Sequence, residues 1–338
     1  MSERVSREFR LAAIPEGMPD ESNFELAEVT VPSPGDGEFV VQNLWMSVDP
    51  YMRGRMMRRE SYIAGFEVGK PLDGGAIGRV VESRNDAFPE GTLVNSMLGW
   101  RETFLSDGNM LGILEPAEGV PLQAYLGVLG MPGLTAYAGL LNVARLGEGE
   151  NVFVSAASGA VGASVCQIAK IKGCYVVGSA GSSDKCSWLE KECGVDSVIN
   201  YRETDDLVSE VKKRFSNGID VYFENVGGLH LVAALESMNF FGRIAMCGMI
   251  SQYNDTTPSH GPSNIVNSVV KSLRIEGFVV SNYLSETPDF RRETEAWIEQ
   301  GRLKWKETVL EGIEKAPEAF LGLFSGANFG KMLVKLSG

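Results

Sequence analysis

The six residues Ala157-Ser158-Gly159-Ala160-Val161-Gly162 are the part of the sequence most suited to binding chemistry. They follow the apolar run NVFVSAA and precede a segment with helical periodicity. This AxGxxG spacing is typical of the turn that holds a dinucleotide. Gly159 would let the pyrophosphate approach the backbone, and Gly162 would let the helix pack closely on the strand. The helix N-terminus would offer N–H groups and a positive dipole end to the phosphates. The alternative is a tight turn without a ligand.

The residues after the next strand bear on which dinucleotide would bind. NAD usually requires an acidic residue at the end of that strand, to hold the ribose 2′-hydroxyl. Residues 178–185 instead read GSAGSSDK, with no carboxylate at the strand end and Lys185 close behind. Lys185 could pair with a 2′-phosphate, which favours NADPH. The alternative is a solvated lysine in a first helical turn, with Asp184 as an ordinary N-terminal helix acid.

Metal ligands and catalytic nucleophiles are scarce in the sequence. A catalytic zinc needs three protein ligands, yet the chain has only His230 and His260, and its five cysteines all lie within residues 166–247. We therefore expect no metal site. Ser158 follows a strand but lacks the GxSxG elbow of hydrolases. We expect His230 to face out of a helix start and His260 to lie in a loop.

The elements that must position these residues fall into three segments. Residues 1–122 read as β-rich, with runs such as EFVVQNLWMSV and AIGRVVES broken by turn-forming residues. Residues 123–301 alternate strand-like runs (NVFVSAA, CYVVGSA, SVIN, IDVYFENV, RIAMCG, LRIEGF) with helical segments, one of which is LHLVAALESMNFF, residues 229–241. Such alternation predicts a doubly wound parallel sheet. Residues 302–338 return to the first domain and end in the strand-like FGKMLVKL.

Composition and charge limit the classes of partner. The 338 residues carry a formal charge of −13, which disfavours nucleic acid or an anionic membrane as the main partner. The sequence has no apolar run of eighteen residues, and the charged stretch MSERVSREFR has no signal-peptide core. The five cysteines are odd in number and include no CxxC pair, as expected for free thiols in a reducing cytosol. We expect a cytoplasmic protein.

Several motifs together resemble one known family. The sequence contains, in order, SVDPYMRGRM, LGVLGMPGLTAYAGLL, VSAASGAVGASVCQIAKIKGCYVVGSAGS, VYFENVGG, MCGMISQYN and NFGKMLVKL. These are similar to the zinc-independent medium-chain reductases, in the branch of leukotriene B4 dehydrogenase/prostaglandin reductase, alkenal double-bond reductase and curcumin reductase. The resemblance implies a Rossmann domain inserted into a GroES-like catalytic domain. It also implies NADPH-dependent reduction of the carbon–carbon double bond of an enal or enone.

The resemblance also implies roles for particular residues. It places Gly159, Ala160, Val161 and Gly162 on the pyrophosphate, Lys185 on the 2′-phosphate and Tyr201 close to the same adenosine end. The rest of the cofactor would be lined by residues of four segments: Asn225, Cys247 and Gly248 through to Tyr253, Phe278, Val279 and Val280, and Asn328. Tyr51 of DPYMR would face the substrate.

The reaction without a metal requires donors for a developing enolate and a source of protons. Tyr253 follows the fifth strand of the nucleotide domain, where doubly wound folds hold ligands, and is our first candidate for the proton donor. It could instead only position the cofactor while water supplies the proton, or be a loop tyrosine packed for its apolar body. Tyr51 is the second candidate, as a donor to the carbonyl oxygen, unless it is a structural aromatic beside Pro50.

Two other functions share the cofactor features. An NADPH quinone reductase would transfer electrons to a ring, and a silent NADPH-binding sensor would bind without turnover; DPYMR, ISQYN and the two tyrosines favour the enone reductase. The resemblance further suggests a homodimer that pairs through a sheet edge near residues 274–278, RIEGF. An exposed edge strand there would otherwise favour aggregation.

Overall fold

The structure, a computed structural model, describes residues 4–337 and divides the chain into two compact units. Unit 1 comprises the described residues up to Leu126 together with Glu307–Asn328 and Met332 onward. Unit 2 comprises Gly127–Lys306 and Phe329–Lys331. The boundaries expected from the sequence, at 122/123 and 301/302, lie a few residues before these limits. The three residues Phe329–Lys331 return to unit 2 inside the expected last segment.

Unit 1 is the antiparallel, β-rich part of the chain. Its sheet runs in the order β14-β15-β3-β4-β5-β7 with β6 paired to β3, and β1 and β2 form a separate two-stranded sheet. The strands are β1 Arg4–Leu11, β2 Phe24–Val31, β3 Phe39–Ser47, β4 Ala76–Ser83, β5 Leu93–Ser96, β6 Thr103–Ser106, β7 Gly112–Ile113, β14 Glu307–Glu311 and β15 Lys331–Lys335. The helices are α1 Tyr51–Arg55, α9 Ala316–Ser325 and the short turns Glu21–Asn23, Leu122–Leu126 and Ile313–Lys315. The last strand, β15, confirms the prediction from FGKMLVKL.

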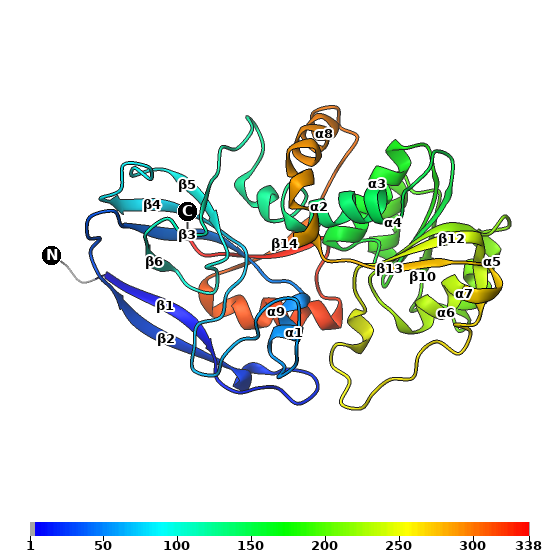
Figure 1. Ribbon diagram of the computed structural model, residues 1–338, viewed down its shortest axis with the longest axis horizontal. Helices are drawn as coiled ribbons and strands as arrows, with labels where there is room; N and C mark the ends of the chain where they lie inside the picture. Colours follow the sequence, from blue (N-terminus) through cyan, green and yellow to red (C-terminus); the bar gives the residue numbers. More distant parts are fainter. Residues whose placement is uncertain (1–3, 338) are drawn as a thin grey trace. The chain divides into compact units, whose positions relative to one another are not determined.

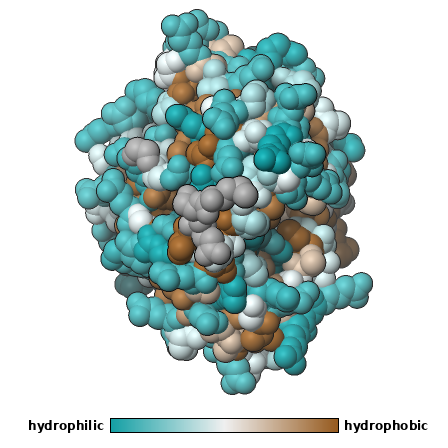
Figure 2. Space-filling model, turned by 90° about the vertical axis from the view of Figure 1, so that its left-hand side faces the viewer, coloured by the Kyte–Doolittle hydropathy of each residue, from teal (hydrophilic) through white to brown (hydrophobic). Residues whose placement is uncertain are grey.

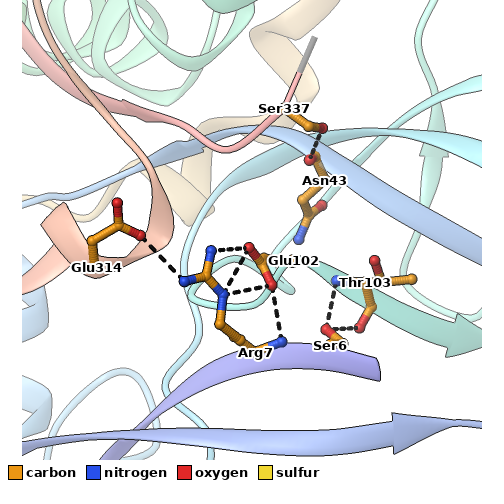
Figure 3. Close-up of polar contacts among 7 residues, drawn as sticks. All are labelled: Ser6, Arg7, Asn43, Glu102, Thr103, Glu314 and Ser337. Carbon is orange, nitrogen blue, oxygen red and sulfur yellow. Dashed lines mark hydrogen bonds and ion pairs between the residues drawn. The ribbon is translucent and has the colours of Figure 1, made fainter. Parts of the chain in front are cut away.

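Polar contacts attach β1 and the C-terminal segment to this sheet (Figure 3). The Arg7 guanidinium of β1 forms an ion pair with Glu102, with Nη2 2.6 Å from Oε1, and the Arg7 N–H donates to the same carboxylate. The Ser6 hydroxyl donates to the Thr103 carbonyl at 2.9 Å and accepts from the Thr103 N–H. The Ser337 hydroxyl donates to the Asn43 carbonyl at 2.9 Å. These bonds join segments that are far apart in sequence.

Unit 2 contains a parallel sheet of six strands, as predicted (Figure 1). The strands are β8 Asn151–Val154, β9 Tyr175–Ala180, β10 Ser197–Asn200, β11 Ile219–Glu224, β12 Met238–Met246 and β13 Arg274–Gly277, in the order β10-β9-β8-β11-β12-β13. Val152, Phe153 and Val154 are all fully buried, because a parallel sheet is covered on both faces and favours continuous apolar runs. The strand order reverses direction between β8 and β11, and such a switch point is where doubly wound folds bind ligands.

Two groups of helices accompany this sheet. Contacts join α2 (Met131–Ala138), α3 (Ala160–Ile171) and α8 (Thr287–Glu299) into one group, and α5 (Leu207–Arg214), α6 (Gly228–Ser237) and α7 (Asn267–Val270) into another. The remaining helical segments are α4 Ser183–Lys191, the π-turn Gly139–Val143 and the 3-10 turns Ile250–Gln252 and Val280–Glu286. Local sequence explains α5: the Asp206 carboxylate caps its N-terminus by accepting from the Ser209 N–H at 3.0 Å, and its last turn is basic.

One predicted helix is too long. The pattern LHLVAALESMNFF predicts a helix over residues 229–241, but α6 ends at Ser237 and β12 begins at Met238. Met238 is buried and pairs with Ile219 of β11, so pairing within the sheet outweighs the helical periodicity. Phe240 and Phe241 are consequently exposed on a strand.

Hydrophilic side chains cover most of the molecular face drawn in Figure 2, and hydrophobic ones gather there only in small groups. Among the described residues, no helix combines the length and the apolar character needed to cross a bilayer.

Candidate cofactor and substrate sites

The glycine turn lies where the sequence predicts it, between β8 and α3. Gly159 is the N-cap residue of α3 and has no side chain with which to cap the first N–H groups. A Cβ on Gly162 would overlap the Ala156 carbonyl oxygen, so only glycine lets the helix start this close to the turn. The turn also requires a positive φ of 47° at Ala156. The first turn of α3 is therefore a site that could receive a phosphate.

Neighbouring segments of unit 2 hold the glycine turn in place. The Ala157 N–H donates to the Ser179 carbonyl of β9 at 2.9 Å. A Cβ on Gly178 would lie 2.8 Å from the Ala157 Cβ, so this glycine also permits a close approach. On another side, the Gly330 N–H donates to the Ser158 carbonyl at 3.0 Å. Sequence reasoning missed Gly330; Asn328, which it did select, belongs to unit 1 and directly precedes Phe329–Lys331 in the chain.

Two cations, Lys185 after β9 and Arg202 after β10, lie close enough for their charges to interact. Lys185 is in the first turn of α4, whose N-cap residue Ser182 accepts from the Lys185 N–H. Burial lowers the pKa of Lys185, and the positive charge of Arg202 lowers that pKa further. A Cβ on Gly181 would lie 2.8 Å from the Tyr201 hydroxyl and 3.2 Å from Arg202 Nε. Tyr201 and Arg202 therefore lie beside Gly181, and Lys185 is close enough to Arg202 for the two positive charges to interact. Sequence reasoning missed Arg202, although it directly follows Tyr201.

His230 does not face outward, and the sequence-based prediction for it was wrong. Its side chain is only 5% exposed, its Nε2 lies 2.7 Å from the Ser179 hydroxyl, and its ring meets the edge of Tyr201. The face of α6 that starts at His230 packs towards the sheet because Leu231, Ala234 and Leu235 are buried there. Burial lowers the pKa of His230 to about 4, so the imidazole is neutral at pH 7. It thus supports both Ser179 and Tyr201.

The carboxyl ends of β8, β11 and β12 bring several predicted residues together. Asn225, directly after β11, donates through Nδ2 to the Ser155 carbonyl at 2.8 Å. Cys247 and Gly248, directly after β12, both donate backbone N–H groups to the Glu224 carbonyl. The Ile250 N–H donates to the Asn225 carbonyl at 3.2 Å. These segments meet at the carboxyl end of the sheet, where the switch point lies.

Tyr253 folds back on its own loop. Its hydroxyl accepts from the Met249 N–H at 3.3 Å, and a Cβ on Gly248 would lie 2.9 Å from that hydroxyl. The hydroxyl thus lies beside Gly248, a predicted cofactor residue.

Phe278, Val279 and Val280 follow β13 at the same end of the sheet. The Phe278 ring packs edge-on against Phe223 and leaves no room for a Cβ on Gly139. The Phe278 side chain thus packs against the carboxyl end of the sheet, and its neighbours Val279 and Val280 are half-buried.

Tyr51 begins helix α1 in unit 1. Its hydroxyl is buried, and among the described residues it has no hydrogen-bond partner. Burial raises the pKa of Tyr51, and the charge of Asp49 raises it further, so the phenol stays protonated. In the same helix, Arg55 forms an ion pair with Asp73 and lies 4.0 Å from the Phe66 ring centre. The Tyr51 hydroxyl is thus a neutral O–H group that can donate to a ligand.

Several methionines and aromatics of unit 1 that could line an apolar pocket are core residues. Met46, Met52, Met56 and Trp100 are each at most 2% exposed and belong to the main cluster of unit 1. Phe66 is partly buried and packs on that cluster. In the described part of the chain, no group of three or more His, Cys, Asp or Glu side chains could hold a metal ion.

The chain is similar to two described protein families and to several known reductases. Residues 7–114 match the N-terminal domain of oxidoreductase, and residues 160–299 match zinc-binding dehydrogenase. The chain is 44% identical to a 2-alkenal reductase (NADP(+)-dependent) of Nicotiana tabacum, covering 100% of this chain and 99% of that protein. It is 38% identical to the NADPH-dependent curcumin reductase of Escherichia coli, covering 98% and 97%.

A solved structure agrees with these matches. CurA from Vibrio vulnificus in complex with NADPH has a TM-score of 0.93 at 37% identity, covering 98% of this chain and 99% of that one. The sequence likeness extends over both units, and the donor set of the described residues offers no zinc site despite the name of the second family. The chain therefore belongs to the zinc-independent medium-chain dehydrogenase/reductases, in the branch of the alkenal and curcumin reductases.

Proposed function

We propose that this chain catalyses the NADPH-dependent reduction of the carbon–carbon double bond in α,β-unsaturated aldehydes and ketones. The observation that carries the proposal is sequence similarity, over nearly the full length of the chain, to two reductases whose names state NADP(+) or NADPH dependence. The chemistry of the two units agrees, since unit 2 has a glycine turn, a pair of cations and the Tyr253 hydroxyl, and unit 1 has the Tyr51 hydroxyl. No acid follows β9 where NAD would need one.

We assign NADPH to residues of unit 2 together with Asn328 of unit 1. We assign Gly159, Ala160, Val161 and Gly162 to the pyrophosphate and Lys185 to the 2′-phosphate, with Arg202 as a second cation beside it. Tyr201 would lie at the adenosine end. The remainder of the cofactor would contact residues of the other strand ends and loops: Asn225, Cys247, Gly248, Tyr253, Phe278, Val279, Val280 and Asn328. When bound, the cofactor supplies the hydride.

Side chains of the protein would then stabilise the negative charge that develops on the substrate and transfer the proton. When the β carbon of the substrate receives hydride, negative charge would move to the carbonyl oxygen and form an enolate, and a proton added at the α carbon would then give the saturated carbonyl compound. We assign the Tyr51 hydroxyl, which is buried and has no hydrogen-bond partner among residues 4–337, as the donor to that oxygen. We assign Tyr253 to the proton transfer, either as the donor or by holding the cofactor while water donates.

The division into units suggests a division of labour. We propose that unit 1 is the GroES-like catalytic domain and that unit 2 is the NADPH-binding domain. We also propose that the protein is cytoplasmic, because its five cysteines are free thiols and three of them are buried.

We further propose a homodimer that forms through β13. This strand is the edge of the six-stranded sheet, and apolar side chains next to it are exposed: Phe240 (68%), Phe241 (72%), Val266 (59%), Val269 (78%) and Val270 (60%). The Phe241 N–H donates to the Lys271 carbonyl, so the two groups of side chains are neighbours. A second copy paired at this edge would cover both the strand and the patch.

Light scattering tests the dimer. We expect twice the chain mass at micromolar concentration, and a monomer for Val269→Glu. The control Met110→Glu, at an equally exposed apolar residue of unit 1, should remain a dimer. A monomeric unmodified protein would show that the patch serves another purpose.

Product analysis tests the reaction. The purified protein is given NADPH with an alkenone, and with a benzoquinone in parallel, each with and without EDTA. We expect the saturated ketone, an intact carbonyl and no effect of EDTA. An allylic alcohol, loss of activity on chelation, or turnover of the quinone alone would contradict the proposal.

A further inference from the structure

Glu224, the last residue of β11, is a buried acid that is assigned neither to cofactor binding nor to proton transfer. Its side chain is 0% exposed. One carboxylate oxygen, Oε1, accepts three hydrogen bonds: from the Val226 N–H at 2.7 Å, the Gly227 N–H at 2.9 Å and the Ser155 hydroxyl at 2.9 Å. A buried carboxylate is costly unless it is well hydrogen-bonded. Its position therefore needs a reason.

The same residue connects three strand ends. Its carbonyl oxygen accepts from the Cys247 N–H at 2.9 Å and the Gly248 N–H at 3.1 Å, after β12. The hydroxyl of Ser155, after β8, accepts in turn from the Asn225 N–H at 2.8 Å. Backbone N–H groups beyond a strand end lack ladder partners and need acceptors. The Glu224 carboxylate bonds to the segments after β8 and β11, whereas its main-chain carbonyl, which any residue here would provide, bonds to the segment after β12.

The charge balance around Glu224 is also unusual. Burial raises the pKa of Glu224, while the N–H groups of Gly227 and Val226 and the hydroxyl of Ser155, which donate to its carboxylate, oppose that rise. Its second oxygen, Oε2, is buried and has no hydrogen-bond partner among the described residues, and the same is true of the Tyr222 hydroxyl on the same face of β11. Cys247 is the other titratable group that faces it, and the charge of Glu224 contributes to the raised pKa of that thiol.

We propose that Glu224 is a positioning residue for the nicotinamide half of the cofactor, through the segments after β8 and β11 that its carboxylate holds together. This role rests on the proposed NADPH site. A Rossmann fold consists of two mononucleotide-binding halves. Lys185, Tyr201 and Arg202 lie after β9 and β10, in the half that would hold the adenosine. The Glu224 carboxylate instead bonds to the segments after β8 and β11, which lie at the switch point.

The role can be tested by comparing two ligands that share the adenosine half. NADPH contacts both halves, whereas 2′,5′-ADP contacts only the first. We expect Glu224→Ala to weaken NADPH binding about tenfold or more, since several hydrogen bonds to a charged group are lost, and to leave 2′,5′-ADP binding within about twofold. Glu224→Gln, whose amide oxygen can still accept, should recover most of the NADPH affinity. Isothermal titration measures both dissociation constants.

A matched control lies on the same strand. Asp220, about 13 Å away at the opposite end of β11, accepts from the Asn151 N–H and from Asn239 Nδ2, and so also joins neighbouring strands. Asp220→Ala should lower the unfolding temperature, as Glu224→Ala does, but leave the affinities for both ligands unchanged. A purely structural Glu224 would behave like Asp220, and that result would overturn the proposal.

A second variant keeps the test decisive if Glu224→Ala does not fold. Ser155→Ala removes one donor to Oε1 and the acceptor of the Asn225 N–H, so it should shift the NADPH to 2′,5′-ADP affinity ratio in the same direction by a smaller factor. An unchanged ratio would overturn the role of Glu224. If the unmodified protein bound 2′,5′-ADP but not NADPH, Glu224's role would fail while the 2′-phosphate assignment stood. Binding of neither ligand would overturn both.

Discussion

Replacing Tyr51 by phenylalanine is expected to make the protein more stable and less active. The Tyr51 hydroxyl is buried and has no hydrogen-bond partner among the described residues. A buried hydroxyl that has lost its water costs about 1–3 kcal/mol. Phenylalanine keeps the ring that packs on the core of unit 1 and removes only that cost. The free energy of unfolding should therefore rise by about 1–3 kcal/mol.

The same change should slow the reaction. In the proposed mechanism this hydroxyl donates to the substrate oxygen as it becomes negative, and removing one such donor typically lowers kcat by about 10²–10³. Burial and the charge of Asp49 raise the pKa of Tyr51, so the phenol is protonated across the ordinary pH range. The loss in kcat should accordingly be the same at pH 6 and pH 8.

Urea unfolding and steady-state kinetics on one preparation test both effects. The midpoint should shift with the slope unchanged. Tyr62→Phe is the control for stability, because Tyr62 is 63% exposed and the same atom deletion should change the free energy of unfolding by less than about 0.5 kcal/mol. A destabilised Tyr51→Phe variant with normal kcat would refute the reasoning, since the hydroxyl would then have a structural partner and no role in turnover.

Four further outcomes follow from the same structure. Burial lowers the pKa of His230 from 6.5 to about 4, so at pH 5.5 the unfolded chain binds a proton that the folded chain does not bind. The free energy of unfolding should therefore fall by about 1.4 kcal/mol from pH 8 to pH 5.5. Urea unfolding of His230→Gln should lack this part of the loss. Lys185→Ala should weaken NADPH binding by about 1.5–3 kcal/mol and leave NADH nearly unaffected in parallel titrations, whereas equal losses would exclude a 2′-phosphate contact. Tyr253→Phe should lower kcat by about 10²–10⁴ if Tyr253 is the sole general acid, and a much smaller drop would assign the proton to water or Tyr51. Burial raises the pKa of all five cysteines, and because thiolates are the form that enals alkylate, intact-mass measurements should show slow labelling by acrolein until the protein is unfolded.

The sheet of unit 2 could be predicted because its signal is local. Each strand is a short apolar run, and the helices between them carry their own caps, such as Asp206 before α5. The glycine turn and Lys185 were found in the same way, since their spacing along the chain determines their place in the fold. The first-turn position of Lys185 follows directly from the strand end and the N-cap residue Ser182.

Contacts between distant segments could not be predicted in this way. His230 lies on a helix whose residues are nearly all apolar, so periodicity does not distinguish its inner from its outer face. Its partner Ser179 is 51 residues away. Likewise, Met238 continues a helical pattern, but the pairing with Ile219 places it in β12. Each outcome depends on which strands are neighbours, and the sequence order does not contain that information.

Three buried polar groups belong to, or contact, residues assigned above to ligand binding. Glu224 accepts three hydrogen bonds on one oxygen, His230 contacts Ser179 and Tyr201, and the buried Tyr51 hydroxyl has no hydrogen-bond partner in the described part of the chain. An apolar residue of similar shape would cost less to bury at each place. Their presence is therefore better explained by ligand binding than by stability, as expected where local rules are broken at functional positions. It follows that apolar replacements at these three residues should lower cofactor affinity or turnover even where they leave the fold intact.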